Sequence, residues 1–482
     1  MRSAESSASS LARLATVHIS VLSLHTSPAA QPGQGDAGGM NVYVDHTVRA
    51  LAAMGHVVDV FTADPNGNGT EQPDAETVTL SENIRLHCLR TDATTKEALA
   101  GRIDDLARLL AAHPAYAAAD LVWAHYWISA EAALRAQALV TGNDVTRVRP
   151  QLIASMHTIG AVKNRDSETE DESPRRLRAE ERIAHRVDLL VANTPAERRD
   201  LIGELGAAPD SVIVARPGVD HDLFSPGSRA AARRELGIAA DEHLVLYVGR
   251  MQFIKGTDVV VDALACLQEN NPAPAASTRG ILLGAASGWT EPADSSDHLG
   301  AEAAAPERRT TDLRTADLRN SDLHTADFHT ADFHAALSAA VAVDPHIEVR
   351  QPVPAADLVT YYRAADVLLV PSRSESFGLV AAEAAASGLP AIASAVGGLP
   401  EVVENGFSGL LIADHNPRHW ALTLERLLGD AQLRAELGEH AVARSQRFDW
   451  HTTVATVLDA LAEAAEPAPR DLAAPGLCGG SR

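Results

Sequence analysis

The chain has 482 residues, of which 46% are apolar, 22% charged and 4% aromatic, and its formal net charge at pH 7 is −23. The length predicts about three domains, and the composition excludes a wholly disordered chain, a collagen and a disulfide scaffold. Because so negative a chain repels nucleic acids and anionic membrane surfaces, we expect neither as a partner.

The cysteines and the apolar runs indicate the compartment. Cys88, Cys266 and Cys478 are odd in number and share no metal-ligand spacing, so neither a disulfide framework nor a zinc site is predicted. No apolar run reaches the roughly 18 residues that a membrane span needs, and residues 11–24 contain an arginine and a histidine, unlike a signal peptide. We therefore expect a cytoplasmic protein with a disordered tail at 1–14.

Short β-branched runs alternate with alanine-rich helical stretches from about residue 17 to residue 414, which predicts an α/β class with parallel sheets covered by helices. Strands in the first half are expected at 17–23, 57–62, 121–124, 152–156 and 189–192. Strands in the second half are expected at 244–248, 281–283, 347–349, 367–370 and 391–393. The two series predict two Rossmann-like sheets.

These series define an N-terminal domain at 15–216 and a C-terminal domain at 217–420. The segment RPGVDHDLFSPG at 216–227 is rich in proline, glycine and aspartate, as expected of an inter-domain connection. The helical run at 421–465 is expected to pack back toward the N-terminal domain. The last residues, 466–482, are expected to form a second disordered tail.

An insertion at about 286–340 interrupts the second domain. Between 311 and 334 an aspartate followed by leucine or phenylalanine recurs every five residues, a period that fits neither one helix face nor one strand face. The pattern resembles a pentapeptide repeat, but five units bury little core. We expect a solvated insertion.

A glycine-rich loop, QPGQGDAGGMN at 31–41, separates the first strand from a predicted helix. Its glycines let backbone amides approach a ligand closely, and the helix start adds a positive dipole, which predicts an anion site. Gly33, Gly35 and Gly38 also match the dinucleotide pattern GxGxxG, with Asp59 further on, so a nicotinamide oxidoreductase stays open. Against it, the first glycine does not follow the strand directly.

Two motifs in the second half carry charge. VGRMQFIKG places Arg250 and Lys255 after a predicted strand, at the edge where open α/β sheets bind ligands, and two cations there suit a diphosphate. PSRSESFGLVAAEAAASGLP places Glu375 before a helix expected to start near Phe377, and Glu383 about two turns on. Carboxylates in this position suit sugar hydroxyls, because they accept charge-assisted hydrogen bonds.

VGRMQFIKG, the pair Glu375 and Glu383, and GGLPEVV together resemble the retaining family 4 glycosyltransferases of GT-B fold, over about residues 17–464. LSLHTSPAAQPGQGDAGGMNVYV, AHYWIS and SMHTIGAVKN resemble, more narrowly, the branch of that family that acts on inositol phosphate in mycothiol biosynthesis. The resemblance implies transfer of N-acetylglucosamine from UDP-N-acetylglucosamine to 1D-myo-inositol 3-phosphate with retention at the anomeric carbon. It also implies two Rossmann-like domains facing across a cleft, a homodimer and no organic cofactor.

The resemblance further assigns roles to residues. The catalytic set that it implies is His157, Arg250, Lys255 and Glu375. The donor-binding set that it implies is Gln31, Pro32, Gly39, Arg250, Lys255, Val353, Glu375 and Glu383, with uracil on the backbone of Val353 and the ribose on Glu383. The acceptor-binding set that it implies is His25, Asp36, Ala37, Gly38, Gly39, Met40, Asn41, Lys96, Tyr126, Thr158 and Arg176. A weak magnesium site, formed mostly by carbonyls, is implied at Tyr362, Arg363, Ala365 and Leu389.

One region departs from the family pattern. The turn after the strand at 281–283 reads GAASGWTEP, with Ala285 and Ala286 where a second glycine and a proline-bearing turn are usual, and the helix expected next is hard to find in the sequence. Three alternatives stay open: a family 4 enzyme with another acceptor, a non-catalytic relative with a repeat-bearing interaction segment, and the nicotinamide oxidoreductase.

Overall fold

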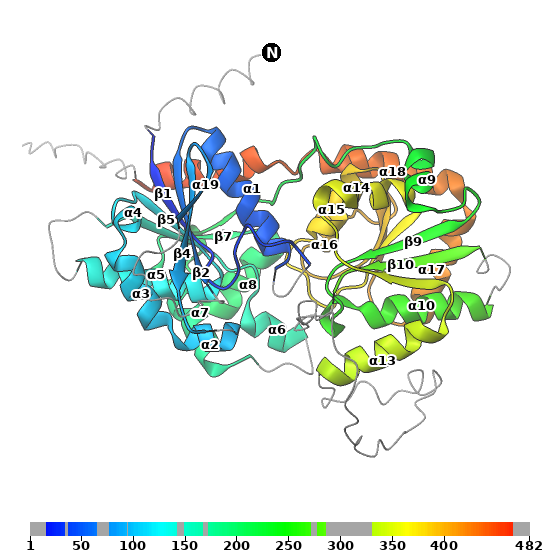
Figure 1. Ribbon diagram of the computed structural model, residues 1–482, viewed down its shortest axis with the longest axis horizontal. Helices are drawn as coiled ribbons and strands as arrows, with labels where there is room; N and C mark the ends of the chain where they lie inside the picture. Colours follow the sequence, from blue (N-terminus) through cyan, green and yellow to red (C-terminus); the bar gives the residue numbers. More distant parts are fainter. Residues whose placement is uncertain are drawn as a thin grey trace, which may run out of the picture.

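The computed structural model describes residues 16–33, 37–64, 77–93, 95–141, 149–166, 172–270, 277–285 and 330–465. They form two α/β units that lie side by side (Figure 1). Each unit has a mainly parallel sheet with helices on both faces, so the α/β class predicted from the alternating pattern is confirmed.

The N-terminal unit contains an eight-stranded sheet in the order β3-β4-β2-β1-β5-β6-β7-β8. Its strands are β1 (His18–Leu22), β2 (Val57–Asp64), β3 (Thr77–Ser81), β4 (Ile84–Arg90), β5 (Leu121–His125), β6 (Gln151–Ser155), β7 (Leu189–Ala192) and β8 (Val212–Val214). Its helices are α1 (Gly39–Ala53), α2 (Lys96–Gly101), α3 (Ile103–Ala112), α4 (Pro114–Ala117), α5 (Tyr126–Thr141), α6 (Gly160–Asp166), α7 (Pro174–Arg186) and α8 (Pro195–Leu205), followed by the 3-10 turn η2 (Pro209–Ser211). Only β3 runs antiparallel to its neighbour.

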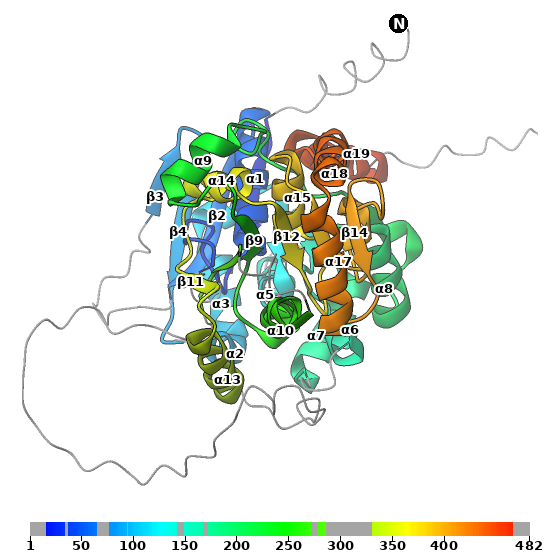
Figure 2. The same cartoon turned by 90° about the vertical axis from the view of Figure 1, so that its right-hand side faces the viewer.

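The C-terminal unit contains a six-stranded parallel sheet in the order β11-β10-β9-β12-β13-β14, with helices on both of its faces (Figure 2). Its strands are β9 (His243–Val248), β10 (Thr278–Leu283), β11 (Ile347–Arg350), β12 (Val367–Val370), β13 (Ala391–Ser394) and β14 (Gly409–Ile412). The helices that follow β8 along the chain are α9 (Arg229–Leu236), α10 (Thr257–Asn270), α13 (Thr330–Val343), α14 (Ala355–Ala364), α15 (Leu379–Ala386), α16 (Leu399–Val402), α17 (Pro417–Gly429), α18 (Ala431–Ser445) and α19 (Trp450–Ala465), with the 3-10 turn η3 (Phe253–Lys255).

The sequence pattern missed four strands: β3, β4, β8 and β14. Every residue of β3 is exposed, so the strand lacks the alternation that marks a half-buried one. The strands β8 and β14 have three and four residues, too few to show a period. The expected strands were found because parallel strands covered on both faces are nearly continuous apolar runs.

The order of strands reverses between β1 and β5 in the first sheet and between β9 and β12 in the second. In open α/β sheets, ligands bind beyond the carboxyl ends of the strands at such a switch point. The loops after β1, β5, β9 and β12 are therefore the places where this fold presents functional side chains.

The helices of the C-terminal segment pack on different units. The helices α17 and α18 pack on the C-terminal unit, against α10 and α15. Only α19 crosses back, as Figure 1 shows, and its apolar side chains join the core of the N-terminal unit. The segment 421–465, which we expected to pack back as a whole, is therefore divided between the two units.

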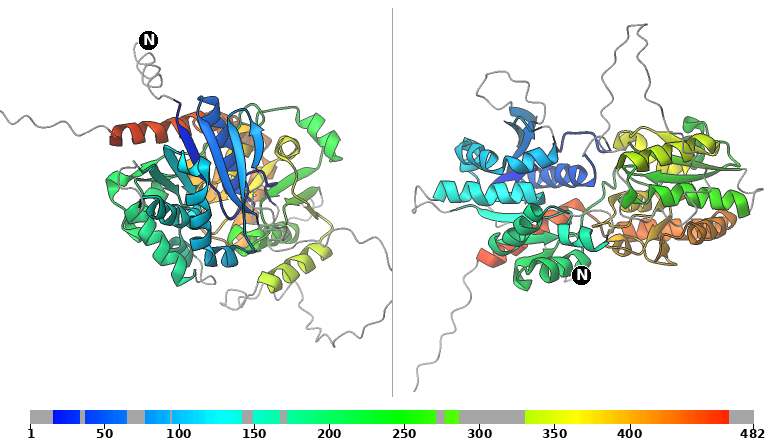
Figure 3. Two further views of the ribbon diagram at one scale, coloured as in Figure 1. Left: turned by 60° about the vertical axis from the view of Figure 1, so that its left-hand side comes forward. Right: turned by 90° about the horizontal axis from the view of Figure 1, so that it is seen from below.

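Two stretches of chain connect the units, one between β8 and α9 and one between α18 and α19, and they lie against each other. The Val219 amide donates to the Phe448 carbonyl at 3.2 Å, and the Thr453 hydroxyl donates to the Arg216 carbonyl at 2.5 Å. A Cβ at Gly218 would lie 2.3 Å from the Trp450 amide nitrogen, so only glycine fits there. Figure 3 shows the two units and these crossings from two further sides.

The helix that the sequence pattern did not reveal is present as α13. It contains Phe333, the last apolar residue of the five-residue repeat, whose ring lies edge-on to that of Phe253, with centroids 6.1 Å apart. The other repeat units and most of the insertion lie outside the described residues. Among the residues that the structure does describe, no helix has the length and apolar character that a bilayer crossing requires.

Removing the anchor of α19 tests this packing. Trp450 is buried between Tyr43 and His46, so we expect Trp450→Ala to lower the free energy of unfolding by about 3–5 kcal/mol, the range for large-to-small changes in a core. Urea unfolding followed by circular dichroism measures the loss. The matched control is Leu422→Ala, which truncates an exposed side chain of α17, and equal stability of the two variants would contradict the packing.

Candidate active site

A cleft of about 1860 Å³ lies between the two units and is lined by both. Its walls include the loops after β1, β5 and β6 on one side and those after β9 and β12 on the other. The predicted site residues that line it are His25, Gln31, Pro32, Gly38, Gly39, Met40, Asn41, Lys96, Tyr126, His157, Thr158, Arg176, Arg250, Lys255, Val353, Glu375 and Glu383. The fold thus brings residues from both halves of the sequence to one place.

Five of the predicted residues that the structure describes do not line this cleft. Ala37 is buried beneath the loop surface, and Asp36 lies outside the described residues. The four residues predicted for magnesium, Tyr362, Arg363, Ala365 and Leu389, are also absent from the cleft walls.

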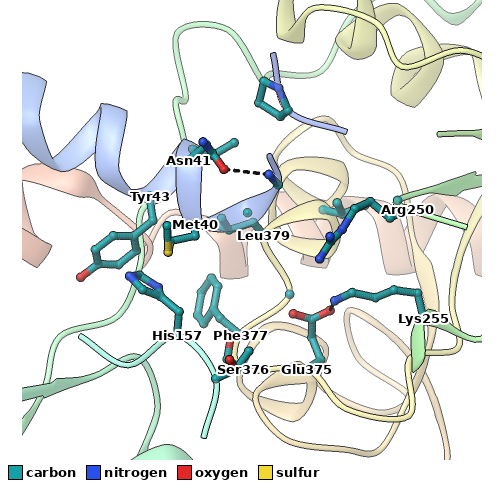
Figure 4. A pocket seen from close by; sticks show the side chains of 18 of the residues that line it. Met40, Asn41, Tyr43, His157, Arg250, Lys255, Glu375, Ser376, Phe377 and Leu379 are labelled. Carbon is teal, nitrogen blue, oxygen red and sulfur yellow. Dashed lines mark hydrogen bonds and ion pairs between the residues drawn. The ribbon is translucent and has the colours of Figure 1, made fainter. Parts of the chain in front are cut away.

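Lys255 and Glu375 form the central ion pair of the C-terminal wall. The Lys255 ammonium lies 2.8 Å from the Glu375 carboxylate, and Arg250 points toward the same place (Figure 4). Lys255 ends the turn η3, and Gly256 follows it with a φ of +69°. A Cβ at Gly256 would lie 2.0 Å from the Pro371 carbonyl oxygen, so this glycine lets the lysine turn pack directly on the end of β12.

A second ion pair, which sequence analysis missed, holds this turn in place. The Arg373 guanidinium bonds both carboxylate oxygens of Asp258, at 2.9 and 2.7 Å, and also donates to the Phe253 carbonyl. Bidentate pairs of this kind fix geometry as well as charge. No sequence signal connects Arg373 with Asp258, because 115 residues separate them.

The helix after Glu375 starts later than expected. The sequence predicted its first amides near Phe377, but α15 begins at Leu379, after Gly378 with a φ of +100°. The Phe377 ring instead packs edge-on against Phe448. A Cβ at Gly397 would lie 1.9 Å from the Glu375 carbonyl oxygen, so the glycine pair of GGLPEVV permits close approach to the Glu375 loop.

Glu383 lies in the first turns of α15 and is buried. Its carboxylate accepts a hydrogen bond from the Tyr362 hydroxyl at 2.9 Å, and burial raises the pKa of Glu383 to about 7, which the hydroxyl only partly offsets. The Tyr362 side chain, which the sequence connected with magnesium, therefore supports Glu383.

The histidines of the N-terminal wall are neutral at physiological pH. His157 Nε2 lies 2.9 Å from His125 Nδ1, and burial lowers the pKa of His157 to about 3. Burial, followed by the positive charge of Lys96, lowers the pKa of His25 to about 3 as well. These rings can exchange hydrogen bonds with a ligand but carry no charge. His125, the partner of His157, was not among the predicted residues.

Two of these residues have a backbone that side chains rarely adopt. The φ of His157 is +60° and that of Tyr126 is +72°, although neither is a glycine. Such conformations cost about 1–3 kcal/mol each and gather at functional sites. Tyr126 directly follows β5 at the switch point, and His157 lies two residues after the end of β6.

A cationic cluster lies deeper in the N-terminal wall. The buried Arg176 guanidinium donates to the Thr158 carbonyl and hydroxyl oxygens, both at 3.0 Å. Arg176 and Lys96 also lie over the ring of Tyr126, at 5.1 and 5.7 Å from its centroid. Arg176 thus contacts both Thr158 and Tyr126, and Lys96 contacts the same tyrosine ring.

The two walls touch through the glycine-rich loop. The Gln31 side-chain amide donates to the Val353 carbonyl at 3.0 Å, and Gly33 lies against Pro352. The buried Asn41 side chain accepts from the Gly38 amide and donates to Thr26, so it holds the loop in shape. The described parts of the loop, 31–33 and 37–41, are therefore held in place as part of the cleft wall.

Asp59, the acidic residue on which the nicotinamide alternative depends, is engaged elsewhere. Asp59 is buried on β2 and pairs with His87 at 2.7 Å and Arg85 at 2.8 Å, both on the adjacent strand β4. An aspartate engaged within the sheet does not reach a ribose in the cleft.

The altered turn after β10 keeps one close approach, since a Cβ at Gly284 would lie 1.9 Å from the Gly249 carbonyl oxygen.

Comparisons with known proteins agree with this site. The model "Glycosyltransferase Family 4" matches residues 37–223, and "Glycosyl transferases group 1" matches 332–444. The D-inositol 3-phosphate glycosyltransferase of Kineococcus radiotolerans is 36% identical over 459 residues, which cover 92% of this chain and 94% of the relative. The relative of the same name from Corynebacterium aurimucosum is 35% identical over 449 residues, 90% of this chain and 93% of the relative.

Among solved structures, sucrose-phosphate synthase from Thermosynechococcus elongatus is similar with a TM-score of 0.72 and 28% identity, over 92% of this chain and 98% of that one. The arrangement of two Rossmann-like units about a cleft is that of a GT-B glycosyltransferase, as the sequence predicted.

The raised pKa of Glu383 predicts a pH effect on stability. Between its ordinary value of 4.5 and about 7 the folded state binds more protons than the unfolded state, so this group lowers the free energy of unfolding as pH rises. Glu383→Gln removes the effect. Relative to the wild type, the variant should gain up to about 3 kcal/mol between pH 4.5 and pH 8, at about 1.4 kcal/mol per pKa unit.

Urea unfolding at the two pH values measures this difference. The control Glu439→Gln, at an exposed position of α18, should follow the wild type at both. A Glu383→Gln variant that also follows the wild type would contradict a neutral Glu383.

Proposed function

The chain belongs to glycosyltransferase family 4, and we propose that it transfers N-acetylglucosamine from UDP-N-acetylglucosamine to 1D-myo-inositol 3-phosphate with retention at the anomeric carbon, a reaction of mycothiol biosynthesis. The observation that carries the proposal is the facing of two cationic groups across one cleft, Arg250 with Lys255 on one wall and Lys96 with Arg176 on the other. A donor diphosphate and an acceptor phosphate need two such groups. The names of the relatives support the identity of the acceptor.

The C-terminal wall holds the donor in this proposal. Arg250 and Lys255 neutralise the diphosphate, and the Glu375 carboxylate, already 2.8 Å from Lys255, grips hydroxyls of the transferred sugar. Glu383 binds the ribose, and the Val353 carbonyl, which accepts from Gln31 at 3.0 Å, meets the uracil. Gln31 thereby brings the N-terminal loop to the nucleotide, with Pro32 and Gly39 beside it.

The N-terminal wall holds the acceptor. Thr158, Lys96 and Arg176 surround one place and present hydroxyl and cationic groups, which suits a phosphate. His25 and Asn41 lie nearer the loop and contact the inositol ring. Since the chain is strongly acidic overall, an anionic acceptor needs such a local concentration of positive charge.

Catalysis in this arrangement is electrostatic. As the bond between the sugar and the diphosphate breaks, positive charge builds on the sugar ring and negative charge on the β-phosphate, so fixed cations at the departing phosphate lower the barrier. The neutral His157 contacts the donor sugar, and the departing phosphate takes the acceptor proton. Closure of the cleft excludes the water that would hydrolyse the donor.

Magnesium, a homodimer and a cytoplasmic location remain predictions. Tyr362, Arg363 and Ala365 lie at the end of α14, where carbonyls lack helical partners and can act as oxygen ligands. Neither they nor Leu389 supplies a carboxylate, which magnesium sites usually contain. Such an ion would be structural, and no step of the reaction passes through it.

Two alternatives are less well supported. A non-catalytic relative has no chemical need to keep Arg250, Lys255, Glu375 and Glu383 together in one cleft. A family 4 enzyme with another acceptor would share the donor wall and differ in the N-terminal one.

Lys255→Ala tests the donor wall. We expect a loss of roughly a hundred- to a thousandfold in kcat, because one cation at the departing charge contributes a few kcal/mol to the barrier. UDP release measures turnover, and circular dichroism checks the fold. The control Arg418→Ala removes an exposed cation from the same unit; a wild-type rate in Lys255→Ala would sink the assignment.

The acceptor is tested by the product. Mass spectrometry of the reaction of UDP-N-acetylglucosamine with 1D-myo-inositol 3-phosphate should show one added N-acetylhexosamine, and free inositol should give little product because it leaves the cationic cluster unpaired. Equal yields from both acceptors would remove phosphate recognition from the proposal.

A further inference from the structure

Glu172 is a carboxylate of the acceptor wall that the proposed mechanism does not use. Glu172 lies just before α7 and lines the cleft, with 17% of its side chain exposed. Its Oε1 atom accepts from Lys163 Nζ at 2.7 Å and from Arg176 Nη1 at 2.7 Å. A single oxygen therefore bridges two cations.

Glu172 is not what holds Arg176 in place. The fully buried Glu180 accepts from Arg176 Nε at 2.6 Å and, through its other oxygen, from the Gly160 amide at 2.7 Å. Thr158 accepts from the other end of the guanidinium. Because Glu180 and Thr158 already fix the orientation of Arg176, the contact with Glu172 needs another explanation.

The contacts of Glu172 are those of a bound anion. A phosphate oxygen binds arginine and lysine in the same way, because it accepts one hydrogen bond from a guanidinium N–H and another from an ammonium group. Burial acts to raise the pKa of Glu172, but the charges of Arg176 and Lys163 outweigh it and lower the pKa, so the carboxylate is ionised at pH 7. Lys96 lies over the ring of Tyr126, as Arg176 does.

We propose that Glu172 is an internal stand-in for the acceptor phosphate: it neutralises Lys163 and Arg176 while the acceptor is absent, and an incoming phosphate displaces it from both. The inference rests on the proposed function, because it takes the acceptor to be anionic. It adds Lys163 to the cations that receive the phosphate. Two anions cannot share these donors, since like charges in contact repel strongly in a half-buried site.

Displacement also gives selectivity. A ligand that brings only a phosphate must compete with Glu172, whereas an acceptor that also places ring hydroxyls in the cleft gains contacts that the carboxylate cannot make. Glu172 thus weakens the binding of simple anions, and this penalty favours a ligand that also contacts the cleft through its hydroxyl groups.

Binding of inorganic phosphate to the full-length chain tests the proposal. Calorimetric titration in saturating UDP keeps the diphosphate site filled, so that phosphate reports on the acceptor wall. Glu172→Gln keeps the size of the side chain and removes its charge, and we expect it to lower the Kd for phosphate about tenfold without changing the Kd for UDP. The control Glu181→Gln, exposed on the same helix, should leave both unchanged.

The opposite result would overturn the proposal. If Glu172→Gln still binds UDP but binds phosphate no more tightly than the wild type, Glu172 organises the cations and does not replace a phosphate. Glu172→Ala gives the same reading should the glutamine variant fail to fold. Tighter phosphate binding in a chain that does not glycosylate inositol 3-phosphate would overturn the proposed acceptor and leave this inference standing.

Discussion

The structure depends on concentrating positive charge at one edge of a sheet in a chain whose net charge is −23. Arg250 and Lys255 follow β9 at the switch point, and the lysine turn is pressed onto the end of β12 at Gly256, where a side chain would not fit. The bidentate pair of Arg373 and Asp258 holds that turn in place. The cations are therefore preorganised, which is what makes fixed charge effective against a developing one.

The opposite wall of the cleft contains both neutral histidine rings and cationic side chains. Burial keeps His25 and His157 neutral, so the positive charge of this wall comes from its lysines and arginines, among them Lys96, Lys163 and Arg176. Lys96 and Arg176 lie over the ring of Tyr126, and the same ring packs against His25 with centroids 4.4 Å apart. The wall therefore presents neutral rings, which can bind sugar hydroxyls, directly beside cations, which can bind an anion.

The connection between the units is short and strongly hydrogen-bonded. Two crossings of the chain run side by side near Val219 and Phe448, and α19 buries Trp450 in the N-terminal core although it follows the last helix of the other unit. Within the described part of the cleft, the Gln31 side-chain amide joins the two walls by donating a hydrogen bond to the Val353 carbonyl.

The sequence by itself determined the α/β class and the two sheets, because buried parallel strands are apolar runs. It also located the glycine-rich loop and the charged turns of the cleft, because such turns follow strands at the ligand-binding edge, and the resemblance to family 4 supplied the other predicted site residues. Only the tertiary structure decided which of these residues act on one another. The pairing of His157 with His125, the bracing of Lys255 by Arg373 and the start of α15 after Gly378 depend on neighbours brought together by folding. Local pattern carries burial and turn chemistry, whereas contacts between distant segments are set by how the sheets and helices pack.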